Sequence, residues 1–216
     1  MLQKARWKIK KVNQITDLQY FPCINSFIDL GKISPINVVA VRPFRKSGFT
    51  NRTIIVGSAG PLSLSIPLKG GRGIRCRLDE VEIDYSADWQ LNHYRTLSTC
   101  YGKSPFFYQF ADELSALYSK KPTRLVDWNL DCYNWSAEKF GFPAAEMGKG
   151  SDTGGNLATP SILRDYRPTN YGSPEMGPFL KYVQVFESSI GFFPNVSILD
   201  FMFCEGPSVG FPFGQA

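Results

Sequence analysis

The stretch NRTIIVGSAGPLSLSIPL, residues 51–68, decides the fold of this chain because it carries the signature of a β-hairpin. Two runs with strand character, 51–56 and 61–68, flank the four-residue turn Gly57-Ser58-Ala59-Gly60. In the second run, aliphatic residues alternate with smaller ones, at Leu62, Leu64, Ile66 and Leu68. A period of two places these aliphatic side chains on one face of the strand. We therefore predict a hairpin with one buried face.

Strand signals also lie on both sides of this hairpin. Val38 to Val41 predicts a buried strand before it, and the alternation of Val81, Ile83 and Tyr85 predicts a further sheet element after it. The loop Gly70-Gly71-Arg72-Gly73 separates that element from the hairpin. It lacks the Walker sequence and the strand-to-helix glycine pattern of a dinucleotide site, so it predicts a mobile basic loop and no nucleotide cofactor.

Helical periodicity dominates the middle of the chain. A short helix is expected after Pro22, and three longer ones follow between Ser86 and Gly141, where Ser86 is a candidate cap for the first and Gly141 a stop for the last. Their apolar stripes begin with Trp89, Phe106 and Leu125. We expect these helices to cover the sheet.

The last third of the chain changes character. Residues 143–178 are rich in Gly, Pro, Ser, Thr and Asn and predict an irregular segment, after which Tyr182–Phe186 predicts a strand and Ser197 caps a terminal helix. The pattern predicts an α/β (α+β mixed) fold, in which a mixed sheet with the hairpin is covered by a cluster of three or more helices. We expect one domain over residues 1–216.

Composition limits the functional classes. The formal net charge is +5, but the basic residues are spread widely and accompany no recognition motif, so we expect an anionic small molecule as ligand and no nucleic acid. No apolar run is long enough to cross a bilayer and no secretory signal is visible, which predicts a cytoplasmic protein without a transmembrane segment. The five cysteines are scattered and there is one histidine, so neither a zinc site nor a disulfide framework is expected.

An ordered set of short motifs spans nearly the whole chain and resembles the WbqC-like family. The motifs are Gln19-Tyr20-Phe21-Pro22, Lys46 with Asn51-Arg52, Leu62-Ser63-Leu64-Ser65-Ile66-Pro67, Trp89-Gln90-Leu91-Asn92-His93, Tyr101-Gly102-Lys103-Ser104-Pro105-Phe106-Phe107 and Ser197-Ile198-Leu199-Asp200. The resemblance implies a bacterial protein linked to surface-polysaccharide or lipopolysaccharide biosynthesis, with a role in modifying an activated amino sugar. Many members carry an acidic residue after the early strand, and this chain has Val41-Arg42-Pro43 there instead.

His93 is the first catalytic candidate. As the only imidazole, it titrates near neutrality and can act as a general base, although a structural histidine hydrogen-bonded beside the sheet fits the pattern as well. Cys23 follows Pro22 at an expected helix start, where helix dipoles can lower a thiol pKa and favour a Cys23/His93 acyl-transfer pair; burial as a small apolar residue is the alternative. Asp200 can orient His93, or it can serve as first-turn charge behind the Ser197 cap.

The substrate-binding candidates carry amide, cationic and hydroxyl groups. Asn51 and Arg52 begin the first hairpin strand, where an amide can bind hydroxyls and a guanidinium can bind phosphate. Lys46 can add a phosphate contact, Tyr101 can stack or donate a hydrogen bond, and Gln184 can bind a sugar hydroxyl. Each of these residues also fits an ordinary surface position on its helix, strand or loop.

Two functional hypotheses follow. The first is a transferase that attaches an acyl or aminoacyl group to an activated amino sugar, with His93 assisting proton transfer. The second is a non-enzymatic protein that binds a polysaccharide intermediate or a polysaccharide-biosynthesis enzyme. A polar cleft combining His93 with Arg52 favours the enzyme, whereas an exposed aromatic patch with these residues apart favours binding or assembly.

Overall fold

The computed structural model describes residues 14–15, 18–32, 35–38, 40, 43–45, 48–148 and 179–207. The described strands are β1 (Gln14–Ile15), β2 (Ile36–Val38), β3 (Arg52–Gly57), β4 (Gly60–Ser65) and β5 (Ala145–Met147). The described helices are α1 (Ile24–Gly31), α2 (Trp89–Tyr101), α3 (Phe107–Tyr118), α4 (Leu125–Phe140), α5 (Glu187–Ile190) and α6 (Ile198–Glu205), with 3-10 turns at Gly71–Gly73 and Leu78–Glu80.

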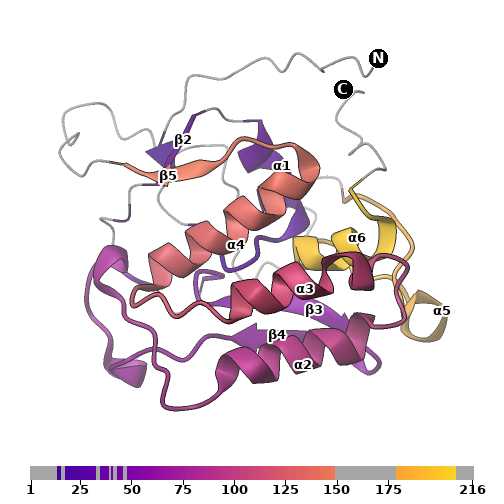
Figure 1. Ribbon diagram of the computed structural model, residues 1–216, viewed down its shortest axis with the longest axis horizontal. Helices are drawn as coiled ribbons and strands as arrows, with labels where there is room; N and C mark the ends of the chain where they lie inside the picture. The colour runs from indigo at the N-terminus through magenta and orange to yellow at the C-terminus, as the bar shows by residue number, and fades with distance from the viewer. Residues whose placement is uncertain are drawn as a thin grey trace.

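The predicted mixed α/β fold with a hairpin and a helical cover is confirmed. Within the described part, the strands form two sheets: β1, β2 and β5 pair in parallel, and β3 and β4 form the antiparallel hairpin. The hairpin turns at Gly57–Gly60, as its sequence predicted, and Arg52 pairs with Ser65 at its open end. Figure 1 shows α4, α3 and α2 one below another, with the hairpin behind them.

The three long helices begin and end close to where their periodicity indicated. Gly141 ends α4 with φ 66°, a left-handed conformation that an L side chain rarely adopts. At the start of α2, however, Asp88 is the N-cap and Ser86 is not; the Ser86 amide instead donates to Asp84 Oδ1 at 2.9 Å. The Asp84 carboxylate thus forms a local turn before the helix.

Several sheet predictions need correction. Residues 182–186 form no strand, although Tyr182 and Gln184 are buried on either side of the exposed Val183. The Val81–Tyr85 element consists of isolated bridges, one of which joins Ile83 to Leu68 beyond the hairpin. Leu62 is 41% exposed, so the buried face of β4 begins at Leu64.

The ends of the predicted irregular segment are only partly visible. Its first residues contain β5, which pairs with β2, and residues 149–178 lie outside the described part. Of the strand expected at 38–41, Val38 belongs to β2, whereas residues 39 and 41 are outside the described part. Residues 41 and 42, where this chain lacks the acidic residue that many family members carry, also lie outside the described part.

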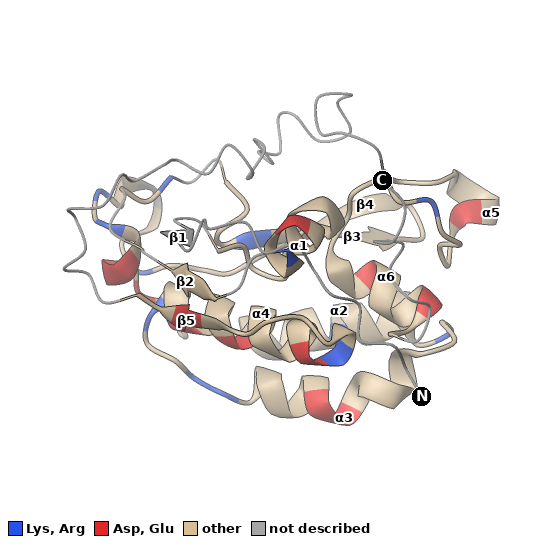
Figure 2. Ribbon diagram, turned by 90° about the horizontal axis from the view of Figure 1, so that it is seen from above, with Lys and Arg blue, Asp and Glu red and all other residues tan. Residues whose placement is uncertain are grey.

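One apolar cluster joins buried residues from Leu18 to Cys204. It places the aromatic side chains of α2, α3 and α4 against the hairpin and against α6. Figure 2 shows that acidic residues lie mainly on the helices, while many basic residues lie on loops at the end of the molecule opposite α5. The described helices include none with the length and apolar character needed to cross a bilayer. The single domain over 1–216 stays a prediction.

Candidate functional site

His93 lies on the inner face of α2 and is only 7% exposed. The Tyr20 hydroxyl contacts His93 Nδ1 at 3.0 Å and the Tyr118 hydroxyl at 2.5 Å, so three titratable groups from distant parts of the chain form one hydrogen-bonded chain. Both tyrosines are buried. A buried chain of this kind holds an imidazole in one orientation.

Aromatic rings enclose this chain. The Trp89 ring meets His93 edge-on at 5.1 Å and Trp128 edge-on at 5.6 Å, while Tyr20 stacks on His93 at 5.9 Å between ring centroids. Trp89 begins α2 and Trp128 lies in the first half of α4. The packing of these two helices therefore builds an aromatic wall around the imidazole.

Burial lowers the pKa of His93 to about 4, because the charged imidazolium loses its hydration, and a hydrogen bond with the Ser65 backbone opposes this shift. The imidazole is therefore neutral at neutral pH. Ser65 pairs with Arg52 across the hairpin, so His93 lies beside the strand position that carries Arg52. This places two of the predicted site residues around one end of β4.

Buried polar atoms without a hydrogen-bond partner in the described part lie around the same end of the hairpin. Asn129 donates through Nδ2 to the Leu18 carbonyl at 2.7 Å and to the Thr50 carbonyl at 2.8 Å, but its Oδ1 has no partner. The same holds for Asn51 Oδ1, although Asn51 Nδ2 donates to the Ile66 carbonyl at 3.1 Å. The indole nitrogens of Trp89 and Trp128 complete this set. Such atoms are rare in folded proteins and mark places where water or a ligand can bind.

The turn that delivers Tyr20 to His93 is strained. Phe21 has φ 40°, which is uncommon for a residue with a side chain, and it is fully buried. Its carbonyl accepts hydrogen bonds from Thr53 Oγ1 at 3.0 Å and Ser197 Oγ at 3.3 Å. Contacts from β3 and from the start of α6 thus hold the turn in this conformation.

A second buried cluster gathers Asp200, Tyr101 and Gln184, three of the predicted site residues. The Asp200 carboxylate accepts from the Tyr101 hydroxyl at 2.6 Å, from Gln184 Nε2 at 2.9 Å and from the Tyr182 hydroxyl. The Tyr101 hydroxyl also accepts from the Val56 amide at 3.0 Å. Burial raises the pKa of Asp200, and the three hydrogen bonds oppose this shift. Asp200 makes these contacts in place of one with His93.

Gln184 uses both ends of its amide within this cluster. Its Nε2 donates to the Phe193 carbonyl at 2.9 Å, and its Oε1 accepts from the Phe193 amide at 2.8 Å. The cluster therefore ties β3, α2, α6 and the 182–193 segment together. Ser197 caps α6 as predicted, since its Oγ accepts from the Leu199 amide at 3.3 Å.

Cys23 lies apart from both clusters. It is the N-cap residue of α1, is buried, and packs with Phe49. Burial raises the pKa of its thiol to about 12, the opposite of the lowered value expected at a helix start, so the thiol stays protonated at neutral pH. The structure does not bring Cys23 to His93.

Among the remaining candidates, Asn51 and Arg52 are half-buried at the start of β3, and Lys46 lies outside the described residues. No group of three potential metal ligands occurs in the described ranges. Tyr20, Tyr118, Trp128 and Asn129 were missed as site residues. A polar Asn129 within the apolar stripe of α4 is a signal that could have identified one of them.

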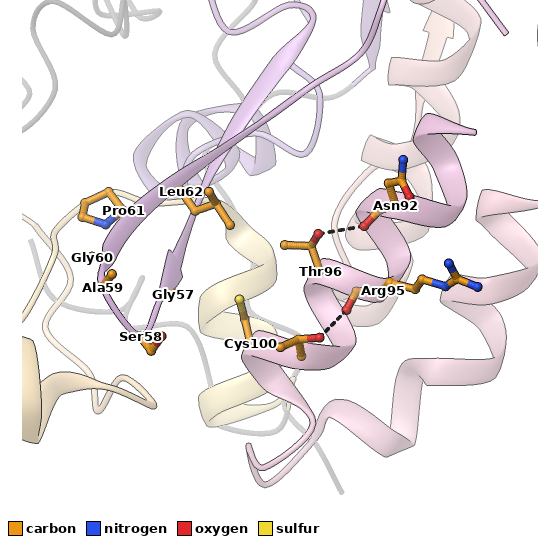
Figure 3. Close-up of a pocket in the computed structure, with 11 residues that line it drawn as sticks. Gly57, Ser58, Ala59, Gly60, Pro61, Leu62, Asn92, Arg95, Thr96 and Cys100 are labelled. Atoms are coloured by element: carbon orange, nitrogen blue, oxygen red, sulfur yellow. Dashed lines mark hydrogen bonds between the residues drawn. The ribbon is translucent and has the colours of Figure 1, made fainter. Parts of the chain in front are cut away.

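A groove of about 600 Å³ lies between the hairpin turn and the outer face of α2. Thr96 and Leu62 line it, and the Cys100 side chain lies toward Gly57 (Figure 3). The Arg95 guanidinium points away from the hairpin in this view. The groove contains none of the predicted site residues and is largely uncharged.

Comparison with known families gives one result. The model of the WbqC-like protein family matches residues 19–177, which include the strained turn, the hairpin and α2 to α4. A comparison with curated proteins and a comparison with solved structures each give no match.

Proposed function

Because the chain belongs to the WbqC-like protein family, we propose that it acts in bacterial surface-polysaccharide biosynthesis as a transferase that acylates an activated amino sugar. In this reaction the sugar nitrogen attacks the acyl carbon of a donor such as a thioester. An amide bond forms, the thiolate leaves, and the nitrogen gives up one proton. The proposed site is the end of the hairpin where Asn51, Arg52 and His93 lie.

The observation that carries this proposal is the Tyr118–Tyr20–His93 chain beside the strand position of Arg52. A neutral imidazole can accept the proton that the sugar nitrogen loses. Its low pKa makes it a weak base, so we propose that it accepts the proton during bond formation and delivers it to the leaving thiolate, which departs as a thiol, while Tyr20 holds the ring in place. Arg52 suits an anionic part of the substrate, and Asn51 Oδ1 suits a hydroxyl or amine.

The test is acyl transfer to a uridine-diphosphate-linked amino sugar, offered with a panel of acyl thioesters and followed by mass spectrometry. We expect a product heavier by one acyl group, and we expect His93→Gln to slow its formation at least about 100-fold. Thr99→Val, an exposed change on the same helix, serves as the matched control. An unchanged rate in His93→Gln would remove His93 from the mechanism.

The alternative function is a binding or assembly protein without catalysis. The groove between the hairpin turn and α2 favours it, because this accessible hollow contains none of the proposed catalytic residues. Binding of an oligosaccharide to wild type, together with absence of product from every acyl donor, would support this alternative over the transferase.

A further inference from the structure

The loops on either side of the hairpin carry several cations, and two of those in the described part have a nearby carboxylate. Lys69 Nζ lies 2.7 Å from Glu82 Oε2, and the Arg77 guanidinium binds Asp79 through two contacts, at 2.6 and 3.0 Å. These pairs neutralise their charges locally.

Arg45 and Arg75 differ from these neighbours. Both are exposed, and neither has a salt bridge within the described part of the chain. An antiparallel bridge pairs Pro43 with Arg77, and the Phe44 amide donates to the Cys76 carbonyl at 3.0 Å. Continuing this register by one residue places Arg45 opposite Arg75. Like charges directly opposite each other on neighbouring strands repel.

A hollow of about 450 Å³ includes Arg75 in its lining, whereas Arg45 lies outside the lining, next to Phe44 in the chain. Arg75 lines it together with an apolar wall formed by Pro43, Phe44 and Ile74. One carboxylate, that of Glu80, also borders the hollow, but its Oε2 accepts from the Arg77 amide at 3.1 Å. The hollow thus combines the Arg75 guanidinium and the Asp79-paired Arg77 with an apolar wall, and the register places Arg45 opposite Arg75 just outside the lining.

We infer that the Arg45–Arg75 pair and this hollow bind a nucleoside diphosphate. A diphosphate accepts paired hydrogen bonds from guanidinium groups and relieves the repulsion between them, while the planar base contacts Pro43, Phe44 and Ile74. The inference deepens the proposed function, and it rests on that function for the identity of the substrate as an activated sugar. The nucleotide of the activated sugar binds in this hollow, which leaves Asn51 and Arg52 to contact the sugar.

Calorimetric titration of the full chain tests this with uridine diphosphate, uridine and inorganic phosphate as separate probes. We expect uridine diphosphate to bind more tightly than either fragment, and more weakly as salt is raised. Arg45→Gln and Arg75→Gln should each weaken its binding about tenfold. Arg95→Gln, which changes an exposed arginine on α2, is the matched control and should leave binding unchanged.

Three outcomes would overturn the inference: no binding of uridine diphosphate, equal affinity for uridine diphosphate and phosphate, or equal losses in Arg95→Gln and Arg75→Gln. Thermal denaturation of each variant checks that the fold is intact. The two proposals fail separately. Nucleotide binding without acyl transfer removes only the transferase, whereas acyl transfer with an unchanged KM in Arg45→Gln and Arg75→Gln removes only the nucleotide site.

Discussion

The Asp200 cluster and the His93 cluster are both buried, but they differ in how completely their polar atoms are paired. Each Asp200 oxygen accepts at least one hydrogen bond, and the donors come from α2 and the 182–184 segment. Around His93, by contrast, Asn51, Asn129, Trp89 and Trp128 each leave one polar atom without a partner in the described residues. A fully paired cluster stabilises a fold, whereas an incompletely paired one is the better candidate for binding.

The largest effect is expected from Asp200→Ala. Removal of the carboxylate leaves the Tyr101 and Tyr182 hydroxyls without their acceptor and removes one of the acceptors of Gln184 Nε2, so the free energy of unfolding should fall by about 3–5 kcal/mol. Urea denaturation measures this change. Asp112→Ala removes an exposed carboxylate on α3 and should change stability by less than about 0.5 kcal/mol. A loss below about 1 kcal/mol in Asp200→Ala would contradict the structural role of this cluster.

The His93 cluster should respond to acid. Because the folded pKa of His93 is about 4, below its ordinary value of 6.5, the unfolded chain binds the proton first and stability falls as pH drops from 6.5 toward 4. The contribution is at most about 3 kcal/mol. Denaturation midpoints between pH 4 and 7 measure it, and His93→Gln should flatten this part of the profile.

The Asp200 carboxylate contributes to the pH dependence of stability with a sign opposite to that of His93. Since the pKa of Asp200 in the folded protein is raised above its ordinary value of 3.8, the native state binds the proton more tightly than the unfolded state does. Stability therefore falls as pH rises from 3.8 through the pKa of the folded state. Asp200→Asn should remove this contribution while leaving the His93 contribution in place. Identical pH profiles for His93→Gln and wild type would show that His93 titrates normally.

A smaller effect is expected from Tyr20→Phe. This variant removes the hydroxyl that contacts His93 Nδ1 and the Tyr118 hydroxyl, at a cost of about 1–2 kcal/mol in unfolding free energy. Because His93 is the only histidine, its ring nitrogen resonances are unambiguous, and the Nδ1 resonance should shift. Tyr94→Phe, on the adjoining position of α2, should leave that resonance in place.

The smallest effect concerns the starts of the two helices that carry Asp200 and His93. Ser197→Ala removes both the side-chain cap of α6 and the hydrogen bond that Ser197 Oγ donates to the Phe21 carbonyl, and should cost about 1–2 kcal/mol. Asp88 at the start of α2 makes no side-chain cap, so Asp88→Ala should cost only a few tenths of a kcal/mol. Thermal denaturation of both variants measures the difference, and equal losses would contradict it.

Much of the fold was predictable because its signals are local. The hairpin follows from alternation and turn residues within 51–68, and α4 ends at Gly141 for a local conformational reason. The strand expected at 182–186 was wrong for a non-local reason. Tyr182 and Gln184 alternate with exposed residues as in a strand, but their side chains point inward to bind Asp200, and no other strand pairs with their backbone.

The candidate site was less predictable, because its contacts join residues far apart in the sequence. Tyr20 and Tyr118 meet only after the Phe21 turn and α3 have packed, and nothing near either residue indicates the contact. The pKa of Cys23 was unpredictable for the same reason. Its position at a helix start was foreseen, but the burial that raises its pKa depends on Phe49 and on the start of α6.

The start of α1 is built against residues from near the other end of the chain. The Ile24 amide donates to the Val196 carbonyl at 2.9 Å, the Ile198 amide donates to the Pro22 carbonyl at 2.8 Å, and the Asn25 amide donates to Asn195 Oδ1 at 2.9 Å. During synthesis on the ribosome, these partners emerge long after α1 has left the exit tunnel. The nascent chain therefore cannot close its core until α6 is made, and until then the strained turn that aims Tyr20 at His93 lacks one of its two supports.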